Sequence, residues 1–177
     1  MKELSLHLLD LIENSVAAGA THVDIVVEED VTNDRLRITV TDDGEGMPAE
    51  LAQAAADPFT TTRTTRSVGM GLALLAGAVA QAAGSLEVTS KPGQGTTIAA
   101  DFQLSNIDRA PLGRVEDTLS AAAAVHPELH LSYLHRGPGG CYEVNLPGLT
   151  QDGSQARLRR EIARLVHEGR QQIGSTA

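Results

Sequence analysis

Runs of apolar residues with helical or strand periodicity divide the chain into a regular series of expected elements. Near the start, Leu4, Leu8 and Leu11 recur every three or four positions, which is typical of an amphipathic helix. Residues 21–29 instead alternate between apolar and polar side chains, as a strand with one buried face does. Up to residue 105 we expect helices at 2–18, 47–56 and 70–83 and strands at 21–29, 35–42, 85–90 and 96–102.

The composition changes near Asn106, where a short linker leads into a second series of elements. A helix is expected at 114–125, followed by strands at 129–136 and 141–146 and a final helix at 154–170. We therefore expect two parts, a domain at 1–105 and an αββα accessory region at 106–177.

The composition restricts the classes of function open to the chain. Its 177 residues carry a formal net charge of −9, which argues against nucleic-acid binding because phosphate contacts need a positive surface. Cys141 is the sole cysteine, so neither an intrachain disulfide nor a multi-cysteine metal site can form. The longest apolar stretch, residues 68–80, is too short to span a bilayer, and the first residues do not form a signal peptide. We expect a cytoplasmic protein that contacts no membrane.

Polar residues of the first expected helix share one face. His7, Asp10 and Asn14 lie within about 60° of one another at 3.6 residues per turn. An asparagine oxygen can ligate Mg²⁺ beside phosphates, and a carboxylate one turn earlier can deprotonate an attacking water or hydroxyl. Solvated polar residues on an amphipathic helix would give the same pattern. His7 is interpreted as a residue at the edge of a site or in the core.

An acidic, glycine-rich segment, TDDGEGMP at 41–48, follows the second expected strand. Asp42 can accept a hydrogen bond from an exocyclic amine such as that of adenine. Gly44 and Gly46 would let the backbone approach a base closely, and Met47 would offer an apolar contact. A plain polar turn between a strand and a helix has a similar composition.

Part of this segment, GEGMPA at 44–49, also satisfies the weaker form of the dinucleotide-binding fingerprint. A pyrophosphate would then lie beside the carboxylates of Asp42, Asp43 and Glu45, and like charges repel. The acidic residue that the fingerprint requires about 20 residues later, at the end of a second strand, is missing from the sequence. We reject the dinucleotide interpretation.

A second glycine-rich segment, VGMGLAL at 68–74, opens an expected helix. Backbone N–H groups at such a helix start can bind phosphates, aided by the helix dipole. The preceding TTTRTTRS supplies hydroxyls and the charges of Arg63 and Arg66, which suits a lid over a terminal phosphate as well as a solvated linker. Further along, Thr96 in GQGTT is placed to reach the Asp42 end of the site across the sheet.

With these motifs in this order, residues 1–105 resemble the GHKL ATPase superfamily, which includes type II topoisomerases, heat-shock chaperones, histidine kinases and MutL proteins. The resemblance implies the Bergerat fold, an α/β (α+β) two-layer sandwich in which helices cover one face of a mixed sheet. It implies ATP and Mg²⁺ as ligands, with Asn14 as the metal-binding residue and Arg63 as a basic residue facing the γ-phosphate. The residues that it implies for ATP binding are Asn14, Asp42, Gly44, Gly46, Met47, Thr61, Thr62, Gly69, Met70, Gly71, Leu72 and Thr96.

Two parts of this region resemble different branches of the superfamily. The opening of the chain, with AGATHVDI at 18–25, is most similar to MutL, whereas VGMGLAL and the short segment before it are most similar to histidine kinases and anti-sigma-factor kinases. Members commonly carry glutamate four residues before the asparagine, and here Asp10 stands at that position. Asp10 is preferred as the base over Glu13, which points roughly 100° away from Asn14 on the helix.

The resemblance implies a stand-alone ATP/Mg²⁺ module of histidine-kinase type that phosphorylates a partner protein or hydrolyses ATP slowly. The motifs are not preceded by a helical hairpin with a phosphoacceptor histidine, so the acceptor is expected on another protein. The alternative is a non-catalytic module in which ATP controls binding to an unidentified regulator or to a second copy in a homodimer.

Overall fold

The protein is described here from a computed structural model, in which residues 3–56, 70–146, 155–175 and 177 are described. Its helices are α1 (Leu4–Ala17), α2 (Ala49–Ala56), α3 (Met70–Gln81), α4 (Val115–Val125) and α5 (Gln155–Ile173). Its strands are β1 (His22–Asp30), β2 (Arg35–Asp42), β3 (Ser85–Ser90), β4 (Thr96–Gln103), β5 (His130–Gly137) and β6 (Gly140–Leu146). Each element expected from the sequence is present, and its ends agree with the expectation to within a few residues.

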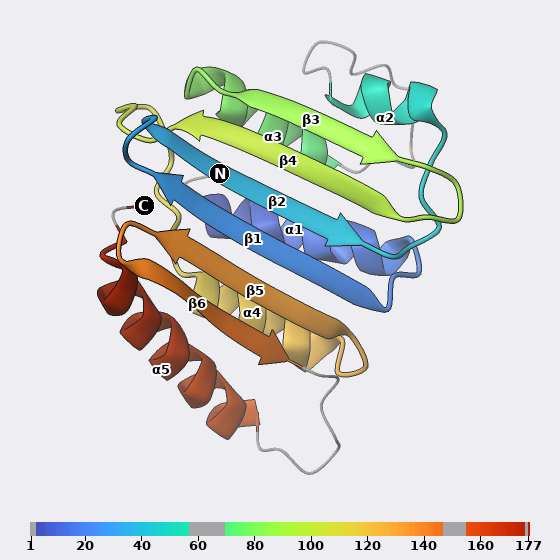
Figure 1. Cartoon of the computed structure of the whole chain (residues 1–177). Helices are drawn as coiled ribbons and strands as arrows, with labels where there is room; N and C mark the ends of the chain where they lie inside the picture. The colour runs from blue at the N-terminus through green and yellow to red at the C-terminus, as the bar shows by residue number, and fades with distance from the viewer. Residues whose placement is uncertain (1–2, 57–69, 147–154, 176) are drawn as a thin grey trace.

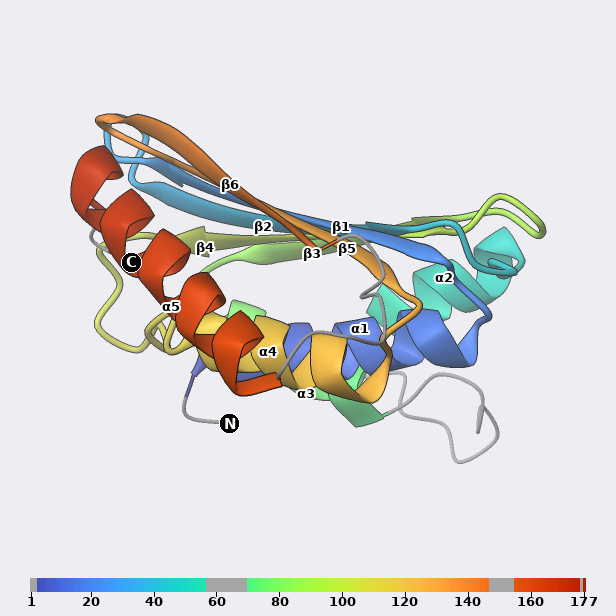
Figure 2. The same ribbon diagram turned by 90° about the horizontal axis from the view of Figure 1, so that it is seen from below.

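The strands form a single mixed sheet in the order β3-β4-β2-β1-β5-β6 (Figure 1). β1 and β5 run parallel, and the other neighbouring pairs are antiparallel. Figure 2 shows the helices on one side of this sheet, with α1, α3 and α4 beneath its middle and α5 beside β6. The expected two-layer sandwich is therefore confirmed.

The core lies between the sheet and the helical layer. In β1 the side chains of Val23, Ile25 and Val27 are buried, while the alternate residues reach the other face of the sheet. α1 meets them with the apolar stripe expected from the sequence, including the buried Leu8 and Leu11. Among the described residues, no helix is both long and apolar enough to cross a membrane.

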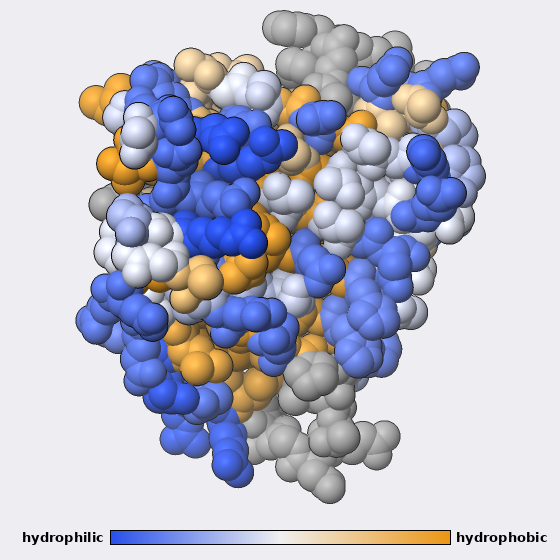
Figure 3. Space-filling model, in the orientation of Figure 1, coloured by the Kyte–Doolittle hydropathy of each residue, from blue (hydrophilic) through white to orange (hydrophobic). Residues whose placement is uncertain are grey.

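The opposite face of the sheet is mainly polar. Figure 3 looks onto this face, where hydrophilic side chains dominate and apolar ones lie between them. Ion pairs cross neighbouring strands here, because Arg136 lies beside Glu28 and Arg37 beside Asp101. Such alternation is usual for a sheet that packs against helices on one side only.

The C-terminal elements extend the same sheet and the same core. β5 pairs with β1 along most of its length, from His130 opposite His22 to Arg136 opposite Glu28. α4 packs beside α1, where the Thr118 hydroxyl donates to the backbone oxygen of Ser5 at 2.9 Å. The two parts of the chain thus share one apolar core, and their division into separate units near residue 105 stays a prediction.

A buried polar cluster holds the C-terminal end of the chain against the sheet. The imidazole of His135 lies 2.8 Å from the Glu29 carboxylate and 3.0 Å from the Tyr133 hydroxyl. The Ser175 hydroxyl donates to the same carboxylate. Burial raises the pKa of Tyr133 well above its ordinary value, so its hydroxyl remains a neutral hydrogen-bonding group. β1, β5 and the residues after α5 are therefore joined by polar contacts as well as by apolar packing.

We predict that Leu119→Ala in α4 lowers the free energy of unfolding of the whole chain. Leu119 is fully buried in the shared core, so its truncation is expected to cost about 2–5 kcal/mol. Val125→Ala, on the same helix at 66% exposure, is the control and should stay within about 0.5 kcal/mol. Urea unfolding followed by circular dichroism and by a nucleotide-site probe should give one coincident transition. Two separate transitions would show that the C-terminal part unfolds independently.

Candidate functional site

A pocket of about 510 Å³ opens between α1, the segment that follows β2, the start of α3 and the start of β4. Six of the residues predicted from the sequence line it, namely Asn14, Asp42, Gly46, Met47, Leu72 and Thr96. The sheet register explains part of this convergence, because Asp42 at the end of β2 lies directly opposite Thr96 at the start of β4. Segments that are far apart in the sequence thus form one concave surface.

Asp42 is the buried carboxylate of the pocket, with 9% of its surface exposed. Its Oδ1 accepts hydrogen bonds from the backbone N–H groups of Gly44 at 3.0 Å and Thr96 at 3.1 Å. Its Oδ2 accepts a hydrogen bond from the Ser15 hydroxyl of α1 at 2.8 Å. A carboxylate has about four lone-pair sites, so one acceptor position remains for a donor in the pocket. The side chain is held in one orientation before any ligand arrives.

The segment after β2 forms one wall of the pocket. Hydrogen bonds hold it to the end of α1 on one side and to the turn between β3 and β4 on the other. The Glu45 N–H donates to the Ala18 oxygen at 2.8 Å, while the Glu45 oxygen accepts from the Gly93 N–H at 2.7 Å. Met47 N–H donates to the Ser90 hydroxyl at 2.8 Å, which joins the segment to the end of β3. This wall is therefore formed by the folded protein itself.

Two glycines allow this close packing of backbone on backbone. Gly46 has a φ of +62°, and a Cβ there would lie 2.1 Å from the Lys91 oxygen. Gly95 has a φ of +79°, and its Cβ would lie 1.9 Å from the Asp42 oxygen. The close approach of these glycines to a base stays a prediction, and Gly46 does line the pocket. The structure shows that Gly46 makes room for the β3–β4 turn, and Gly44 for the carbonyl of Ala18 at the end of α1.

The chemistry of the pocket suits a flat ring that carries an amine. Its sides are largely apolar, with Leu11, Met47, Leu51 and Ile98 among the lining residues, while Asp42 supplies an oriented acceptor. Apolar walls with a small number of fixed polar groups are typical of sites for small organic ligands. Asn14 lines the same pocket from the solvent-exposed side of α1.

Neighbouring carboxylates have other partners. Asp43 accepts hydrogen bonds from the backbone N–H groups of Thr21 at 2.7 Å and His22 at 2.8 Å. Burial by itself would raise the pKa of Asp43. The hydrogen bonds from these N–H groups and from the Thr21 hydroxyl lower the pKa by more than burial raises it, so the pKa of Asp43 lies well below its usual range. Glu13 lies 3.0 Å from His126 at the end of α4 and faces away from the pocket.

Asp10 lies one turn before Asn14 and is half-buried against α3. A Cβ on Gly71 would lie 2.7 Å from the Cβ of Asp10 and 3.1 Å from its Oδ2. Glycine at position 71 thus lets the first turn of α3 approach the Asp10 carboxylate directly. Asp10 therefore lies beside the start of α3 and one turn from Asn14, but it is not among the residues that line the pocket.

The residues present fit a magnesium ion that is held mainly by phosphates. No group of three or more His, Cys, Asp or Glu side chains that could hold a metal occurs among the described residues. Mg²⁺ keeps several waters and usually takes only one or two protein ligands beside substrate phosphates. The exposed amide of Asn14 at the pocket can supply such a ligand.

Several predicted residues are not placed by the structure. Thr61, Thr62, Arg63 and Gly69 lie outside the described residues, and of Met70 only the backbone at the start of α3 is described. Their assigned roles stay predictions.

Ile98 and Ser15 are among the pocket residues that were not predicted from the sequence. Ile98 lies two residues after Thr96 on β4, so strand alternation alone would have placed both on one face. Ser15 faces the core side of α1 and reaches Asp42, which only the three-dimensional fold reveals. Ser90 does not line the pocket, but it pairs with Thr96 in the strand register and accepts a hydrogen bond from the Met47 N–H.

Comparison with known proteins identifies the class of this site. The family model described as "Histidine kinase-, DNA gyrase B-, and HSP90-like ATPase" matches residues 2–106. The chain is 37% identical over 111 residues to the sensor protein kinase FleS of Pseudomonas aeruginosa, a match that covers 62% of this chain and 27% of FleS. It is 32% identical over 111 residues to the non-motile and phage-resistance protein of Caulobacter vibrioides, covering 58% of this chain and 13% of that protein. The matches thus span only a small part of these relatives.

A solved structure has a similar fold over nearly the whole chain. The MutL ATPase domain of Aquifex aeolicus, complexed with ADP, aligns with 93% of this chain and 70% of its own, with a TM-score of 0.53 and 15% identity. At this identity the likeness concerns the fold alone.

We predict that Gly95→Ala disrupts the pocket, whereas Gly93→Ala in the same turn is tolerated. Both glycines have similar positive φ values, +79° and +72°, so both variants bear a backbone strain of about 1–2 kcal/mol. A Cβ at Gly93 meets nothing within 4 Å, whereas one at Gly95 collides with the Asp42 backbone. Gly95→Ala should therefore weaken the binding of adenine nucleotides more than about tenfold, measured by calorimetry, and Gly93→Ala less than about twofold. Equal losses in the two variants would contradict this account of the turn.

Proposed function

The chain belongs to the histidine kinase-, DNA gyrase B- and HSP90-like ATPase family and contains an ATP-binding, kinase-like module, and from this we propose that it uses Mg²⁺ and ATP to phosphorylate a partner protein or to hydrolyse ATP slowly. The observation that carries the proposal is the carboxylate of Asp42 at one end of an apolar pocket. Protein donors fix its direction and leave an acceptor position for the adenine amine.

The other residues suit the phosphate end of the nucleotide. Asn14 would hold Mg²⁺, which when bound neutralises phosphate charge, and the N–H groups at the start of α3 would face the phosphates. Asp10 would accept the proton of the attacking water or partner hydroxyl. The oxygen of that water or hydroxyl bonds to the γ-phosphorus as the bond between the γ-phosphorus and the ADP oxygen breaks. The glycine at position 71 keeps that carboxylate against α3.

We predict that Asp42→Asn weakens ATP binding about 10- to 100-fold, because one charge-assisted hydrogen bond contributes about 1.5–3 kcal/mol. The asparagine oxygen can still accept from Gly44 and Thr96, but its amide would place a donor against the adenine amine. Asp43→Asn is the matched control, since that carboxylate binds Thr21 and His22 and does not line the pocket. Isothermal calorimetry with Mg²⁺ and ATP measures both. Equal affinity of Asp42→Asn and the wild type would refute adenine recognition by Asp42.

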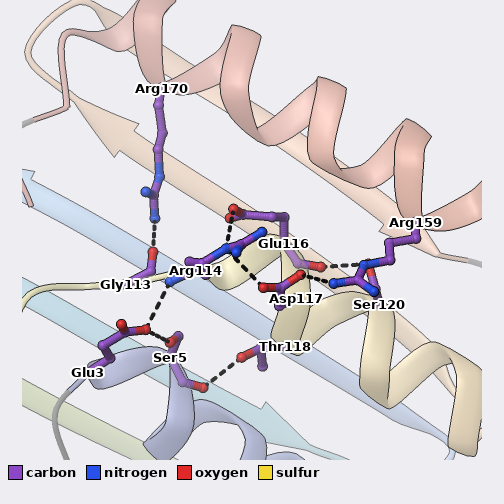
Figure 4. A network of polar contacts seen from close by, with 10 residues as sticks. All are labelled: Glu3, Ser5, Gly113, Arg114, Glu116, Asp117, Thr118, Ser120, Arg159 and Arg170. Carbon is purple, nitrogen blue, oxygen red and sulfur yellow. Dashed lines mark hydrogen bonds and ion pairs between the residues drawn. The ribbon is translucent and has the colours of Figure 1, made fainter.

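A second function, ATP-controlled protein binding without turnover, is supported by the contacts of α1. At its N-terminus Leu4 N–H donates to the Pro111 oxygen, and the Glu3 carboxylate accepts from the Arg114 N–H at 3.3 Å. Figure 4 shows Glu3 and Arg114 beside α4, and Arg170 of α5, which donates to the Gly113 oxygen at 2.9 Å. The helix that carries Asp10 and Asn14 is thereby joined to the C-terminal elements. A movement of α1 on nucleotide binding would therefore shift the C-terminal elements too.

Asp10→Asn is expected to separate the two functions. If the chain is an enzyme, this variant binds ATP with unchanged affinity but loses most of its ATP hydrolysis or of its phosphate transfer from radiolabelled ATP to a partner. Asp108→Asn, on an exposed turn far from the pocket in sequence, serves as the charge-matched control. A wild-type protein that binds ATP, shows no turnover and labels no partner, while Asp10→Asn still captures the same partner with ATP, would leave the non-catalytic function.

A further inference from the structure

His7 on α1 is a buried histidine whose polar atoms are unpaired. It is 2% exposed, and neither Nδ1 nor Nε2 has a hydrogen-bond partner among the described residues. A buried polar group without a partner costs about 1–3 kcal/mol, so native structures contain few of them. A leucine would fill this site in the core without that cost. The imidazole therefore calls for an explanation beyond packing.

Asp10 lies one turn after His7 on the same face of the helix. Residues three apart on a helix have Cβ atoms about 5–6 Å apart, a separation that a hydrogen bond between an imidazole and a carboxylate can span. Burial lowers the pKa of His7, and the charge of Asp10 raises it, which places the carboxylate within electrostatic reach of the ring. Neutral imidazole still carries one N–H donor at this pKa.

The carboxylate of Asp10 needs a group to direct it. Gly71 bounds it on one side, but the carboxylate accepts no hydrogen bond from any described residue. Asp42, which lines the pocket, is by contrast oriented by three donors. A general base works only when its acceptor oxygen lies within hydrogen-bond reach of the proton it removes, so an undirected carboxylate is a poor one.

We propose that His7 is a positioning residue for Asp10: in the nucleotide-bound protein its ring N–H donates to the Asp10 carboxylate and directs the other oxygen at the attacking water or hydroxyl. The inference rests on the proposed function, because it concerns the base of that reaction. His7 acts through Asp10, since at 2% exposure its own ring cannot reach a substrate water.

The kinetic test compares His7→Leu with the wild type. His7→Leu should leave the unfolding midpoint unchanged or raised and the ATP dissociation constant within about twofold, while kcat falls about 10- to 100-fold, as misplacement of a reacting group does. At least one of His7→Asn and His7→Gln, whose amide N–H can replace a ring N–H, should recover part of kcat. In an Asp10→Asn background, His7→Leu should cause no further loss.

Ser5→Ala is the matched control, because Ser5 is also buried and polar on α1 but donates to Glu3, away from the pocket. It should keep kcat. A His7→Leu enzyme with wild-type kcat, or a loss of kcat that persists undiminished in Asp10→Asn, would overturn the inference.

Nuclear magnetic resonance tests the same contact without turnover. In the wild type with saturating Mg²⁺ and a non-hydrolysable ATP analogue, the His7 ring N–H should give a downfield, slowly exchanging proton signal that is lost in Asp10→Asn. If turnover is absent but this signal is present, the reaction proposed above fails and the His7–Asp10 contact stands. A signal that is missing in the wild type, or unchanged in Asp10→Asn, shows that the contact does not form.

Discussion

The hydrogen bonds to the Asp42 carboxylate join three of the segments that form the pocket. Ser15 reaches it from α1, Gly44 from the segment after β2, and Thr96 from β4. A buried carboxylate without such donors would be strongly unfavourable, so its burial depends on the helix, the segment and the strand coming together around it. The same donors fix the direction of its free lone pair. The fold and the recognition group are therefore determined together, because the contacts that solvate the carboxylate also orient it toward the ligand.

α1 is the element through which the two ends of the molecule are connected. Its C-terminal end contacts the pocket wall through the Ala18 oxygen, and its N-terminal N–H groups donate to the Pro111 and Leu112 carbonyls. Four N–H groups at the start of any helix lack partners within the helix. In α1, backbone carbonyls from the C-terminal half of the chain accept hydrogen bonds from two of these N–H groups. The parallel pairing of β1 with β5 adds a second connection. The αββα region is thus structurally continuous with the module that carries the pocket.

Local patterns in the sequence were sufficient to predict the elements and much of the site, but not their assembly. The periods of α1 and β1 depend on residues a few positions apart, and so their bounds were nearly correct. The parallel β1–β5 pair depends on partners more than a hundred residues apart, which no local pattern encodes. Gly46 was recognised as important, but the atom that it accommodates, the Lys91 oxygen, belongs to a distant turn. Ser15 is one position from Asn14, yet its role follows only from the burial of Asp42.

The chain has a net charge of −9, so binding the triphosphate of ATP requires that most of its carboxylates lie away from the phosphates. The arrangement of the carboxylates around the pocket meets this requirement. Adjacent residues on an extended segment point in opposite directions, so Asp42 enters the pocket while Asp43 turns to Thr21 and His22. Glu13 likewise turns to His126, away from the phosphate end. In the proposed complex the Asp42 carboxylate would meet the adenine amine and not a phosphate. The N-terminus of α3, with its partial positive charge, lies beside Asp10. In the proposed complex Asp10 would lie near the phosphates, where the partial positive charge at the start of α3 offsets their repulsion, and the orientation of its carboxylate would decide whether it can remove a proton.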